Sequence, residues 1–571
     1  MAVNTDDLQR QSIAVLGEPE LALLQPFGEL RTTQAGDVLF DAGEPSDVLV
    51  VVLSGRIEIF DRSDGGETAI RTTGPGEFAG ELGLLTGQTR FSACIVREAG
   101  EVLMVPRAGV REVIAIMPVL SDVLVTAFAA RRQLLMLAAA ATLTLIGPET
   151  SPSLERLQEF TTRNRIPYRC LTREDPAAIA LLQRFGVDAG ASVWVVVRGQ
   201  KLLADPSNLE VARAIGLDLT VEQEAPADLL VIGAGPAGLS AAVYAASEGL
   251  TTIVIDDFGI GGQAGSSSRI ENYLGFPTGI SGGELAFRAE VQALKFGARV
   301  TVPRQAMSLT RENGLLAIHL NDGTTLRGWS VVIATGAQYR DLGLPEQEVF
   351  QGIGVHYAAT ELEARLCRDA EVIVVGAGNS AGQAAMFLSG TASTVHLICR
   401  GPDLGRSMSQ YLISRTEHTP NVQIHTSCVV TALQGQEHLQ SATIANAQDE
   451  PKHLPARALF VMIGANPRTE WLRGTVALDE KGFILTGPEV TIDGCPAVLS
   501  PFQTSHPGVF AVGDVRGGSV KRVASAVGEG SVVVQAVHRY LAETRGRMEQ
   551  GVGAVPRDHA VTNGDENIRA R

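Results

Sequence analysis

The sequence predicts a multidomain fold in which an antiparallel β-roll with helices is followed by a small α/β unit and two larger α/β domains. Three observations support this prediction. The chain has 571 residues, more than one hydrophobic core usually organises. Short β-type runs separated by Gly turns fill residues 30–108, whereas strands alternate with helices from residue 142. Two strand–glycine–helix openings then follow, roughly 145 residues apart.

Composition and charge narrow the class of protein. The net charge is −16 and there is no Lys/Arg stripe, so nucleic-acid binding is not expected. The most apolar run, residues 134–147, is shorter than the roughly 20 residues that a membrane-spanning helix needs, so no span is expected. The start, MAVNTDDLQR, has no signal-peptide core, and six scattered Cys show no metal-type spacing. A cytoplasmic protein without a bound metal is predicted.

Residues 1–138 form the first predicted domain. The runs GDVLFDAGE, DVLVVVLSGRIEIFDR and EVLMVPR predict strands of a small antiparallel roll or barrel. A helical pattern follows from about 108 to 138.

Within this roll, PGEFAGELGLLTGQTRFSAC at 75–94 resembles the phosphate-binding cassette of cyclic-nucleotide-binding domains. The resemblance implies three contacts to a cyclic nucleotide: backbone approach at Gly80, a ribose hydroxyl at Glu81 and the cyclic phosphate at Arg90. Two positions depart from the family pattern, because Thr89 replaces the usual Pro and Phe91 replaces a small residue. A roll kept as a docking or oligomerisation surface is therefore the alternative.

Residues 139–222 form the second predicted domain. Strands TLTLIG, PYRCLT and SVWVVVRG alternate with helical segments SLERLQEFTTRN, DPAAIALLQRFG and NLEVARAIG. This order resembles the thioredoxin or glutaredoxin fold. Where such domains carry redox cysteines, after the first strand, the sequence reads GPETSPS. The resemblance thus implies a catalytically silent adaptor, with Cys170 as an alternative nucleophile.

A dinucleotide site is predicted within DLLVIGAGPAGLSAAVYAASEGLTTIVIDD, at residues 228–257. An apolar strand runs into Gly233-x-Gly235-x-x-Gly238, a helix follows, and a second strand ends at Asp256. The first Gly allows the tight turn, the second lets backbone approach a pyrophosphate, and the third lets the helix pack closely. The helix N-terminus offers free amides to the phosphates, and Asp256 is placed to bind a ribose.

Further motifs follow in order: GGQAGSSSRIENYLGFPTGISGGEL, VVIATGA, GVFAVGDVR and KRVASAVGEG. Together they resemble the thioredoxin reductase branch of two-dinucleotide flavoproteins, over about residues 226–545. The resemblance implies a homodimer with tandem Rossmann-like domains: an FAD-binding domain in two parts, 226–340 and 465–545, around an NAD(P)H-binding domain at 341–464. The polar, Gly-rich residues 546–571 are predicted to be a disordered tail.

The resemblance also implies a set of FAD contacts. Asn272 would lie near the isoalloxazine, Asp514 would hold the ribityl chain, and residues 522–524 would start a helix at the pyrimidine edge of the flavin. A helix N-terminus there would stabilise negative charge on the reduced flavin. The full set is Gly233, Gly235, Pro236, Ala237, Gly238, Asp256, Gln263, Asn272, Gly336, Gly513, Asp514, Arg522, Val523 and Ala524.

A second dinucleotide site is predicted within EVIVVGAGNSAGQAAMFLSGTASTVHLICRG. Its turn consists of Gly376, Gly378, Asn379, Ser380 and Ala381, and the strand that follows ends at Arg400 instead of an acid. An acid would hold a ribose 2′-hydroxyl, whereas an Arg can pair with a 2′-phosphate, so NADPH is predicted over NADH. The second Arg common in the family is replaced by Gly401, so NADH remains the alternative.

The segment between the two glycine patterns lacks a dithiol. In thioredoxin reductases it carries a Cys-x-x-Cys that takes electrons from the flavin, and the matching positions here are Ala358 and Glu361. Neither residue can form a disulfide. Thr360 and Glu363 fit a helix capping box, which explains the acids without chemistry. His356, Tyr357 and the single Cys367 are predicted to be packing residues.

The leading hypothesis is an NADPH-dependent flavoprotein oxidoreductase of the thioredoxin reductase-like class. Hydride would pass from NADPH to FAD and then directly to an unidentified small-molecule or protein acceptor. One alternative is a thioredoxin-disulfide reductase whose thiols lie at Cys367 or in a partner. Another is a nucleotide- and redox-sensing regulatory flavoprotein, in which the roll responds to a cyclic nucleotide.

Overall fold

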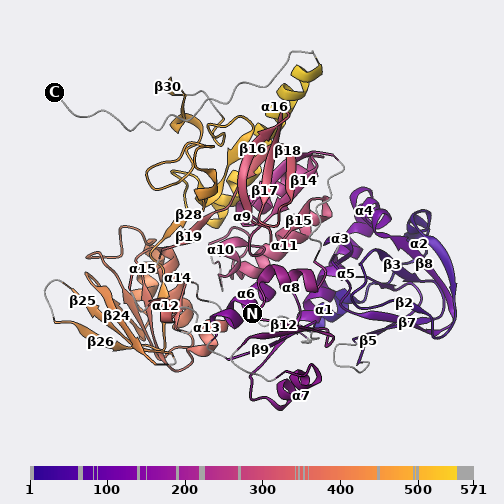
Figure 1. Cartoon of the computed structure of the whole chain (residues 1–571), viewed down its shortest axis with the longest axis horizontal. Coiled ribbons are helices and arrows are strands. Elements are labelled where there is room, and N and C mark those ends of the chain that lie inside the picture. Colours follow the sequence, from indigo (N-terminus) through magenta and orange to yellow (C-terminus); the bar gives the residue numbers. More distant parts are fainter. Residues whose placement is uncertain are drawn as a thin grey trace.

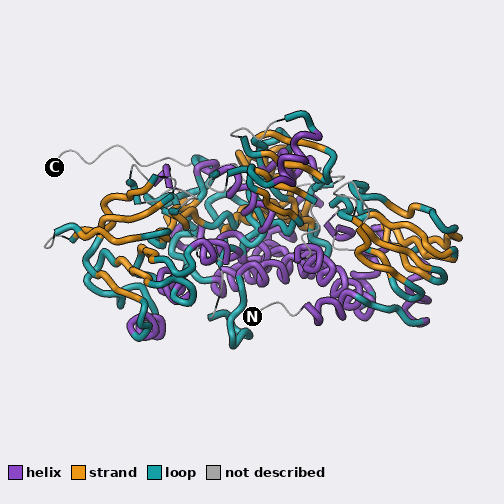
Figure 2. Tube along the Cα trace, turned by 90° about the horizontal axis from the view of Figure 1, so that it is seen from below, coloured by secondary structure: helices purple, strands orange, loops and turns teal. Residues whose placement is uncertain are grey.

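The computed structural model places four units along the chain (Figure 1). The roll and the segment from α12 to β27 lie at opposite ends of the long axis, and the α/β unit lies between them below the remaining sheet. Figure 2 shows the helices concentrated between strand-rich ends. The structure describes residues 5–61, 68–80, 83–86, 88–137, 142–148, 151–187, 192–217, 225–267, 270, 272–340, 342–344, 347–350, 354–357, 359, 361–436, 438–446, 450–492, 495–496 and 500–549.

The N-terminal unit is an antiparallel roll built from two four-stranded sheets, ordered β1-β8-β3-β6 and β2-β7-β4-β5. The predicted roll and the helices after it are confirmed. Its strands are β1 (Glu29–Thr33), β2 (Val38–Phe40), β3 (Val48–Val52), β4 (Arg56–Asp61), β5 (Thr68–Thr73), β6 (Phe78–Ala79), β7 (Ala93–Glu98) and β8 (Gly100–Pro106). Its helices are α1 (Thr5–Ser12), α2 (Glu18–Leu24), η1 (Gln25–Phe27), α3 (Gly83–Thr86), α4 (Arg107–Ile116) and α5 (Pro118–Leu137).

The second unit is a four-stranded sheet with helices, ordered β10-β9-β11-β12. β9 and β10 are parallel, whereas β11 is antiparallel to both of its neighbours. The predicted strands and helices are present, and a hairpin adds β12; the assignment to the thioredoxin fold stays a prediction. The elements are β9 (Leu143–Ile146), α6 (Pro152–Arg163), β10 (Tyr168–Leu171), α7 (Pro176–Arg184), β11 (Trp194–Val197), β12 (Lys201–Ala204) and α8 (Asn208–Ala214).

The third unit is a larger sheet ordered β15-β14-β13-β18-β17-β16, and the late strand β31 (Val509–Ala511) pairs with β18. Helices α9, α11 and α16 cover one face through a shared core. Its first part contains β13 (Ala227–Ile232), α9 (Pro236–Ser247), β14 (Thr252–Ile255), α10 (Gly262–Gly265), α11 (Gly282–Lys295), β15 (Arg299–Thr301), β16 (Ala306–Glu312), β17 (Leu315–Leu320) and β18 (Thr325–Ile333).

The second part of this unit returns to the sheet from residues far along the chain. It contains η2 (Glu470–Leu472), η3 (Gly487–Glu489), β29 (Thr491–Ile492), β30 (Cys495–Pro496), β31, η4 (Gly513–Val515) and α16 (Val523–Glu549). α16 extends four residues past 545, where the sequence placed the start of a disordered tail. Residues 550–571 of that predicted tail lie outside the described residues.

The fourth unit is a parallel sheet ordered β20-β27-β21-β22-β23. Helices α14 and α15 pack on one face, and an antiparallel layer β24-β25-β26 packs on the other. The elements are α12 (Gln347–Phe350), β20 (Val355–His356), α13 (Glu361–Leu366), β21 (Glu371–Val375), α14 (Asn379–Leu388), β22 (Thr394–Ile398), α15 (Gln410–Glu417), β23 (Val422–His425), β24 (Val429–Gly435), β25 (Leu439–Ala445), β26 (Lys452–Pro455) and β27 (Ala458–Val461).

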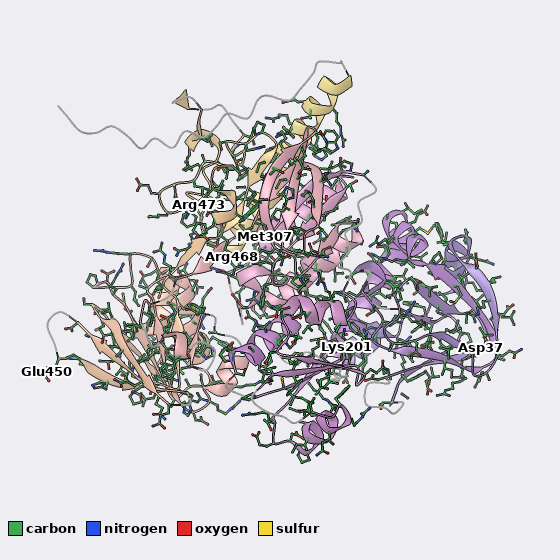
Figure 3. The ribbon with its side chains drawn as sticks, viewed as in Figure 1. Asp37, Lys201, Met307, Glu450, Arg468 and Arg473 are labelled. Atoms are coloured by element: carbon green, nitrogen blue, oxygen red, sulfur yellow. The ribbon has the colours of Figure 1, made fainter. Side chains whose placement is uncertain are left out.

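Two chain segments connect the third and fourth units, and they pair with each other as antiparallel strands β19 (Ala337–Tyr339) and β28 (Ala465–Pro467). Figure 3 labels Arg468 at the end of this connection, where it pairs with Asp257 of the third unit. Among the described helices, none combines the length and apolar character of a membrane span. The described part of the chain also contains no cluster of His, Cys, Asp or Glu suited to a metal.

Candidate functional site

Four parallel strands of the third unit end at one edge of the sheet. Ile232, the last residue of β13, pairs with Ile255 of β14 and with Ile333 of β18. Ile333 pairs in turn with Ala511, the last residue of β31. The turns after these strands therefore lie side by side, and they carry most of the predicted FAD contacts. This edge, at the carboxyl ends of parallel strands, is where α/β folds bind ligands.

The first glycine turn has the geometry that its sequence pattern predicts. Gly233 has φ +111°, and a Cβ there would lie 2.3 Å from Ala334 O. A Cβ on Gly238 would lie 1.8 Å from Gly233 O, so only Gly lets α9 begin this close to the strand. At Gly235 the nearest atom to a Cβ is Gly262 Cα at 3.8 Å, an ordinary van der Waals distance, so this position is less crowded than Gly233 or Gly238. The pyrophosphate contact predicted at the N-terminus of α9 stays a prediction.

Asp256 holds the glycine turn against the next loop. Its Oδ2 accepts from Ala234 N at 2.8 Å, and its Oδ1 accepts from Phe258 N at 3.0 Å and Gly259 N at 2.9 Å. Burial, followed by the charge of Asp257, raises the pKa of Asp256, while the three amides oppose that rise. The described role is structural, and the ribose contact stays a prediction.

The loop from 258 to 263 crosses the glycine turn. A Cβ on Gly262 would lie 3.0 Å from Gly235 Cα, so the two backbones are in close contact. Gln263 lies next to this contact and its Nε2 donates to Ala337 O in β19. Asn272 is exposed and belongs to the segment after the loop. The structure thus brings Gln263 to the strand edge; for Asn272, proximity to the flavin stays a prediction.

The late part of the chain completes this edge. Gly513 has φ +75°, and a Cβ there would lie 2.9 Å from the Cβ of Ala237 on α9. Its N–H donates to Glu529 Oε2 at 2.7 Å, and Glu529 Oε1 accepts from Arg516 at 2.6 Å. Sequence reasoning missed Glu529, although a single acid within the small-residue run SAVGEGSVVV is a signal for such a partly buried partner.

Asp514 lies next to this pair and is partly buried. Burial raises the pKa of Asp514, Lys521 opposes that rise, and Glu529 adds to it. Lys521 Nζ donates to Asp514 O at 3.2 Å and lies 4.3 Å from the centre of the Phe483 ring. Lys521 is a second residue that sequence reasoning missed.

The helix start predicted at residues 522–524 is present. Val523 is the first residue of α16, and Arg522 and Ala524 are exposed beside it. Gly336, which has φ +65°, has no atom within 4 Å of the position of a Cβ. The backbone is thus open at Gly336, and the FAD contacts of residues 522–524 stay a prediction.

The fourth unit repeats this arrangement. Val375 ends β21 and pairs with Ile398 of β22 and Val461 of β27. A Cβ on Gly376 would lie 2.3 Å from Met462 O, whereas Gly378, which caps α14, has no atom closer than 4.0 Å to that position. The turn is therefore tight at its first Gly and open at its second.

The remaining predicted nucleotide contacts surround this turn. Asn379 Oδ1 accepts from Ser409 N at 2.7 Å, which ties the start of α14 to the following loop. Ser380 is exposed and Ala381 is fully buried. Arg400 is exposed two residues after β22, at the same edge as the glycine turn, and Arg406 is exposed in the following loop.

The segment between the two glycine patterns contacts the α/β unit. Ala358 lies outside the described residues, and Glu361 begins α13. His356 is 6% exposed and its ring centre lies 5.4 Å from that of Phe460, which agrees with the predicted packing role. His356 Nδ1 also lies 3.7 Å from Glu155 Oε1 on α6, a contact that the sequence did not indicate.

The contact between Glu155 and His356 is not an ion pair at neutral pH. Burial lowers the pKa of His356 to about 4, with a smaller contribution from Arg457. Burial, then the carboxylates of Glu363 and Glu159, raises the pKa of Glu155 to about 8. Both groups are therefore uncharged near pH 7, although their separation meets an ion-pair distance.

The structure shows five free cysteines: Cys94, Cys170, Cys367, Cys399 and Cys428. Cys367 is fully buried, and burial raises the pKa of its thiol to about 11, which agrees with the predicted packing role. Cys428 N donates to Cys399 O at 3.0 Å, so these two residues are neighbours. Their side chains nevertheless join the cores on opposite faces of the sheet, so they do not form a redox pair.

In the roll, the candidate Arg90 is turned inward. It is 4% exposed and lies 3.9 Å from the Phe40 ring. Its guanidinium donates to Pro45 O at 3.2 Å and Val48 O at 2.8 Å, and it lies 3.4 Å from Asp47. Gly80 O accepts from Arg131 of α5 at 2.7 Å, and Glu81 lies outside the described residues.

The neighbours of Arg90 explain the departures from the family pattern. Thr89 N donates to Gly216 O at 3.2 Å, a bond that the usual Pro could not make. Its hydroxyl donates to Ile215 O and accepts from Arg198 at 2.7 Å. The Phe91 ring lies 4.8 Å from the buried guanidinium of Arg132. Residues 89 and 91 therefore dock the cassette on other elements.

With both glycine turns described, known families can be compared. The model of the pyridine nucleotide-disulphide oxidoreductase family matches residues 227–530. The chain belongs to this family. The model of the cyclic nucleotide-binding domain matches residues 30–116, so the roll is a domain of that type. Members of the pyridine nucleotide-disulphide oxidoreductase family use FAD and NAD(P)H, and this protein is accordingly an NAD(P)H-dependent flavoprotein oxidoreductase.

Individual relatives agree with the family assignment. A thioredoxin reductase of Streptomyces clavuligerus is 31% identical over 317 residues, 55% of this chain and 94% of the relative. An NADH dehydrogenase of Ferdinandcohnia aciditolerans is 31% identical over 318 residues, 55% of this chain and 58% of the relative. The crystal structure of Lactococcus lactis thioredoxin reductase matches with a TM-score of 0.50 and 27% identity, over 56% of this chain and 99% of that one.

Proposed function

We propose that this oxidoreductase transfers electrons from NADPH through FAD directly to a small-molecule or protein acceptor, without a dithiol of its own. One observation carries the proposal: the six cysteines include no Cys-x-x-Cys, and the structure shows five of them to be free. Cys399 and Cys428 are neighbours in the structure, but their side chains lie on opposite faces of a sheet. Dithiol exchange requires two thiols within reach of a mixed disulfide.

The proposed FAD site is the strand edge of the third unit. Residues 233–238 would hold the pyrophosphate, and Asp514 with the start of α16 would face the ring end of the cofactor. When bound, FAD supplies the two-electron chemistry between nicotinamide and acceptor. The positive end of α16 favours the negative charge that accompanies flavin reduction.

The proposed nicotinamide nucleotide is NADPH. Arg400 supports this because it is an exposed cation at the edge that carries the Gly376 turn. No acid stands at that strand end to bind a free ribose 2′-hydroxyl. NADH remains the alternative, because Gly401 replaces the second Arg and one relative is an NADH dehydrogenase.

A spectroscopic experiment tests the proposal. The purified protein is expected to show an oxidised flavin spectrum that bleaches on anaerobic addition of NADPH and recovers with ferricyanide or a quinone. Steady-state reduction of these acceptors should continue without thioredoxin. A protein that holds FAD but is not reduced by NADPH or NADH would contradict the proposal.

A variant with all six cysteines replaced separates the proposal from the disulfide reductase alternative. Unchanged turnover with ferricyanide and no reduction of thioredoxin support direct transfer. Two results would favour a disulfide reductase instead. One is turnover that requires Cys367, and the other is reduction of thioredoxin by the wild-type protein but not by the cysteine-free variant.

A second candidate function is regulation through the roll, and Thr89 and Arg90 favour it. A cyclic phosphate that engages Arg90 must displace its contacts with Pro45, Asp47 and Val48. Thr89 is the next residue and bonds the α/β unit, so that displacement would disturb the contact between the two units. Cyclic AMP or cyclic GMP is expected to change the KM for NADPH about fivefold or more. Identical kinetics with and without either nucleotide would remove this candidate.

A further inference from the structure

The C-terminal end of α6, in the α/β unit, contacts the loop that crosses the first glycine turn. Three consecutive residues, Arg163, Asn164 and Arg165, each donate to a backbone carbonyl of the third unit. The acceptors are Gly262 O at 3.3 Å, Phe258 O at 3.0 Å and Gly283 O. All the residues proposed to bind FAD lie in the third unit. The contact with α6 therefore connects the α/β unit to the proposed FAD site.

Asn164 is the centre of this contact. It is 6% exposed, and its Nδ2 donates to Phe160 O at 2.8 Å on its own helix and to Phe258 O across the boundary. A Cβ on Gly259 would lie 3.0 Å from that same Nδ2. The Phe160 and Phe258 rings meet edge to face at 6.4 Å. The beginning of the loop is therefore held by both a polar and an apolar contact.

The two arginines extend this contact, Arg163 to the loop and Arg165 to the neighbouring helix α11. Arg163 lies 5.1 Å from the Phe258 ring centre and is oriented by Glu159 at 2.6 Å on the same helix. Arg165 lies 4.1 Å from the ring centre of Phe287 on α11 while it donates to Gly283 O. Both guanidinium groups thus bridge an aromatic ring and a carbonyl of the third unit.

This loop needs external support because of its composition. Residues 258–263 read FGIGGQ, and Gly261 and Gly262 have φ +98° and +53°. Glycines lose more conformational freedom on folding than other residues, so such a loop is costly to order. Its position matters, because Gly262 touches Gly235 and Gln263 binds Ala337 O.

We propose that Arg163, Asn164 and Arg165 are positioning residues of the FAD site. Arg163 and Asn164 hold loop 258–263 against the glycine turn, and Arg165 holds the start of α11, on which this loop packs. This inference rests on the proposed FAD site. It gives the α/β unit a role in cofactor binding that requires no thiol. The three residues act through backbone carbonyls of the loop and of α11, and they are not assigned a contact with the cofactor itself.

The test compares two arginines of the same helix. Arg163→Met removes the bond to Gly262 O, and Asn164→Ala removes the bond to Phe258 O. The matched control is Arg156→Met, because the guanidinium of Arg156 bonds Asn208 and Pro206 O within the α/β unit. The full-length protein is used, stripped of FAD and reconstituted, and both the FAD dissociation constant and the visible circular dichroism of the bound flavin are measured.

Arg163→Met and Asn164→Ala are each expected to raise the dissociation constant of FAD about 3- to 10-fold and to change the flavin circular dichroism. Arg163→Lys should restore part of the affinity, and Arg156→Met should leave both readouts at their wild-type values. Equal values in all variants, or equal changes in Arg156→Met, would overturn the inference. A wild-type protein that takes up no FAD would instead overturn the proposed function.

Discussion

The bond network of Thr89 gives the most quantitative prediction. Thr89→Val keeps the shape of the side chain and removes its hydroxyl. The hydroxyl donates to Ile215 O and accepts from Arg198 at 2.7 Å, so two hydrogen bonds between the roll and the α/β unit are lost. A typical bond contributes about 0.5–1.5 kcal/mol net. Arg198 keeps a second acceptor, Ile215 O at 3.2 Å, which limits the cost of leaving its guanidinium unpaired. The expected loss of unfolding free energy is about 1–3 kcal/mol.

A double-mutant cycle measures the part of this free energy that comes from the interaction between Thr89 and Arg198. Thr89→Val, Arg198→Met and the double variant are unfolded with urea, and the intensity of tryptophan fluorescence reports the transition. Trp194 lies in the α/β unit, whereas Trp329 and Trp471 lie in the third unit. The coupling energy is expected to be about 1 kcal/mol.

Thr89→Pro extends the series, because it also removes the N–H that donates to Gly216 O at 3.2 Å. It should therefore cost about 1 kcal/mol more than Thr89→Val. Additive single substitutions, or a Thr89→Pro variant as stable as wild type, would refute the assignment of this residue as an interdomain contact.

Three further predictions concern the nucleotide sites and the contact between Glu155 and His356. Arg400→Ala should raise the KM for NADPH about 10-fold or more and leave the KM for NADH nearly unchanged, and equal effects on both would contradict the 2′-phosphate role. Gly238→Ala should abolish FAD retention on gel filtration, because its Cβ would lie 1.8 Å from Gly233 O. Glu155 stays protonated in the folded state up to about pH 8, so folding stability should fall as pH rises from about 6.5 to 8. His356 has the opposite effect at lower pH. Because its pKa is lowered from 6.5 to about 4, its titration makes folding stability rise with pH between these two values. The decline is expected to be about 1 kcal/mol, because solvent screens a side chain that is 29% exposed, and Glu155→Gln should remove it. A Glu155→Gln variant whose unfolding free energy has the same pH dependence as wild type from about pH 6.5 to 8 would contradict this prediction.

Local patterns made the nucleotide turns predictable. The strand, the glycines and the following helix at Gly233 and Gly376 are contiguous in sequence, and each spacing has a steric reason that the structure reproduces. The β-roll was predictable for a similar reason, because its strands and Gly turns alternate over short distances.

Contacts between distant residues were not predictable in this way. Thr89 meets Gly216, and Asn164 meets Phe258, only because separate units pack together, and no periodicity in the sequence reports such packing. Glu529 is conspicuous as a lone acid among small residues, but its partner is the backbone amide of Gly513, which no sequence pattern identifies, so the pair was missed. Arg90 fits a ligand motif, yet its acceptors are carbonyls that the motif does not contain.

The core of the roll does not stop at the end of α5. Phe287, Val291 and Leu294 of α11, which belong to the third unit, are buried in the same apolar cluster as Leu124 and Phe128. A fragment that begins at residue 226 would therefore present an apolar stripe to water, and such stripes promote self-association. The N-terminal units are therefore needed to cover this apolar face of α11, and a reductase that lacked residues 1–225 is expected to self-associate.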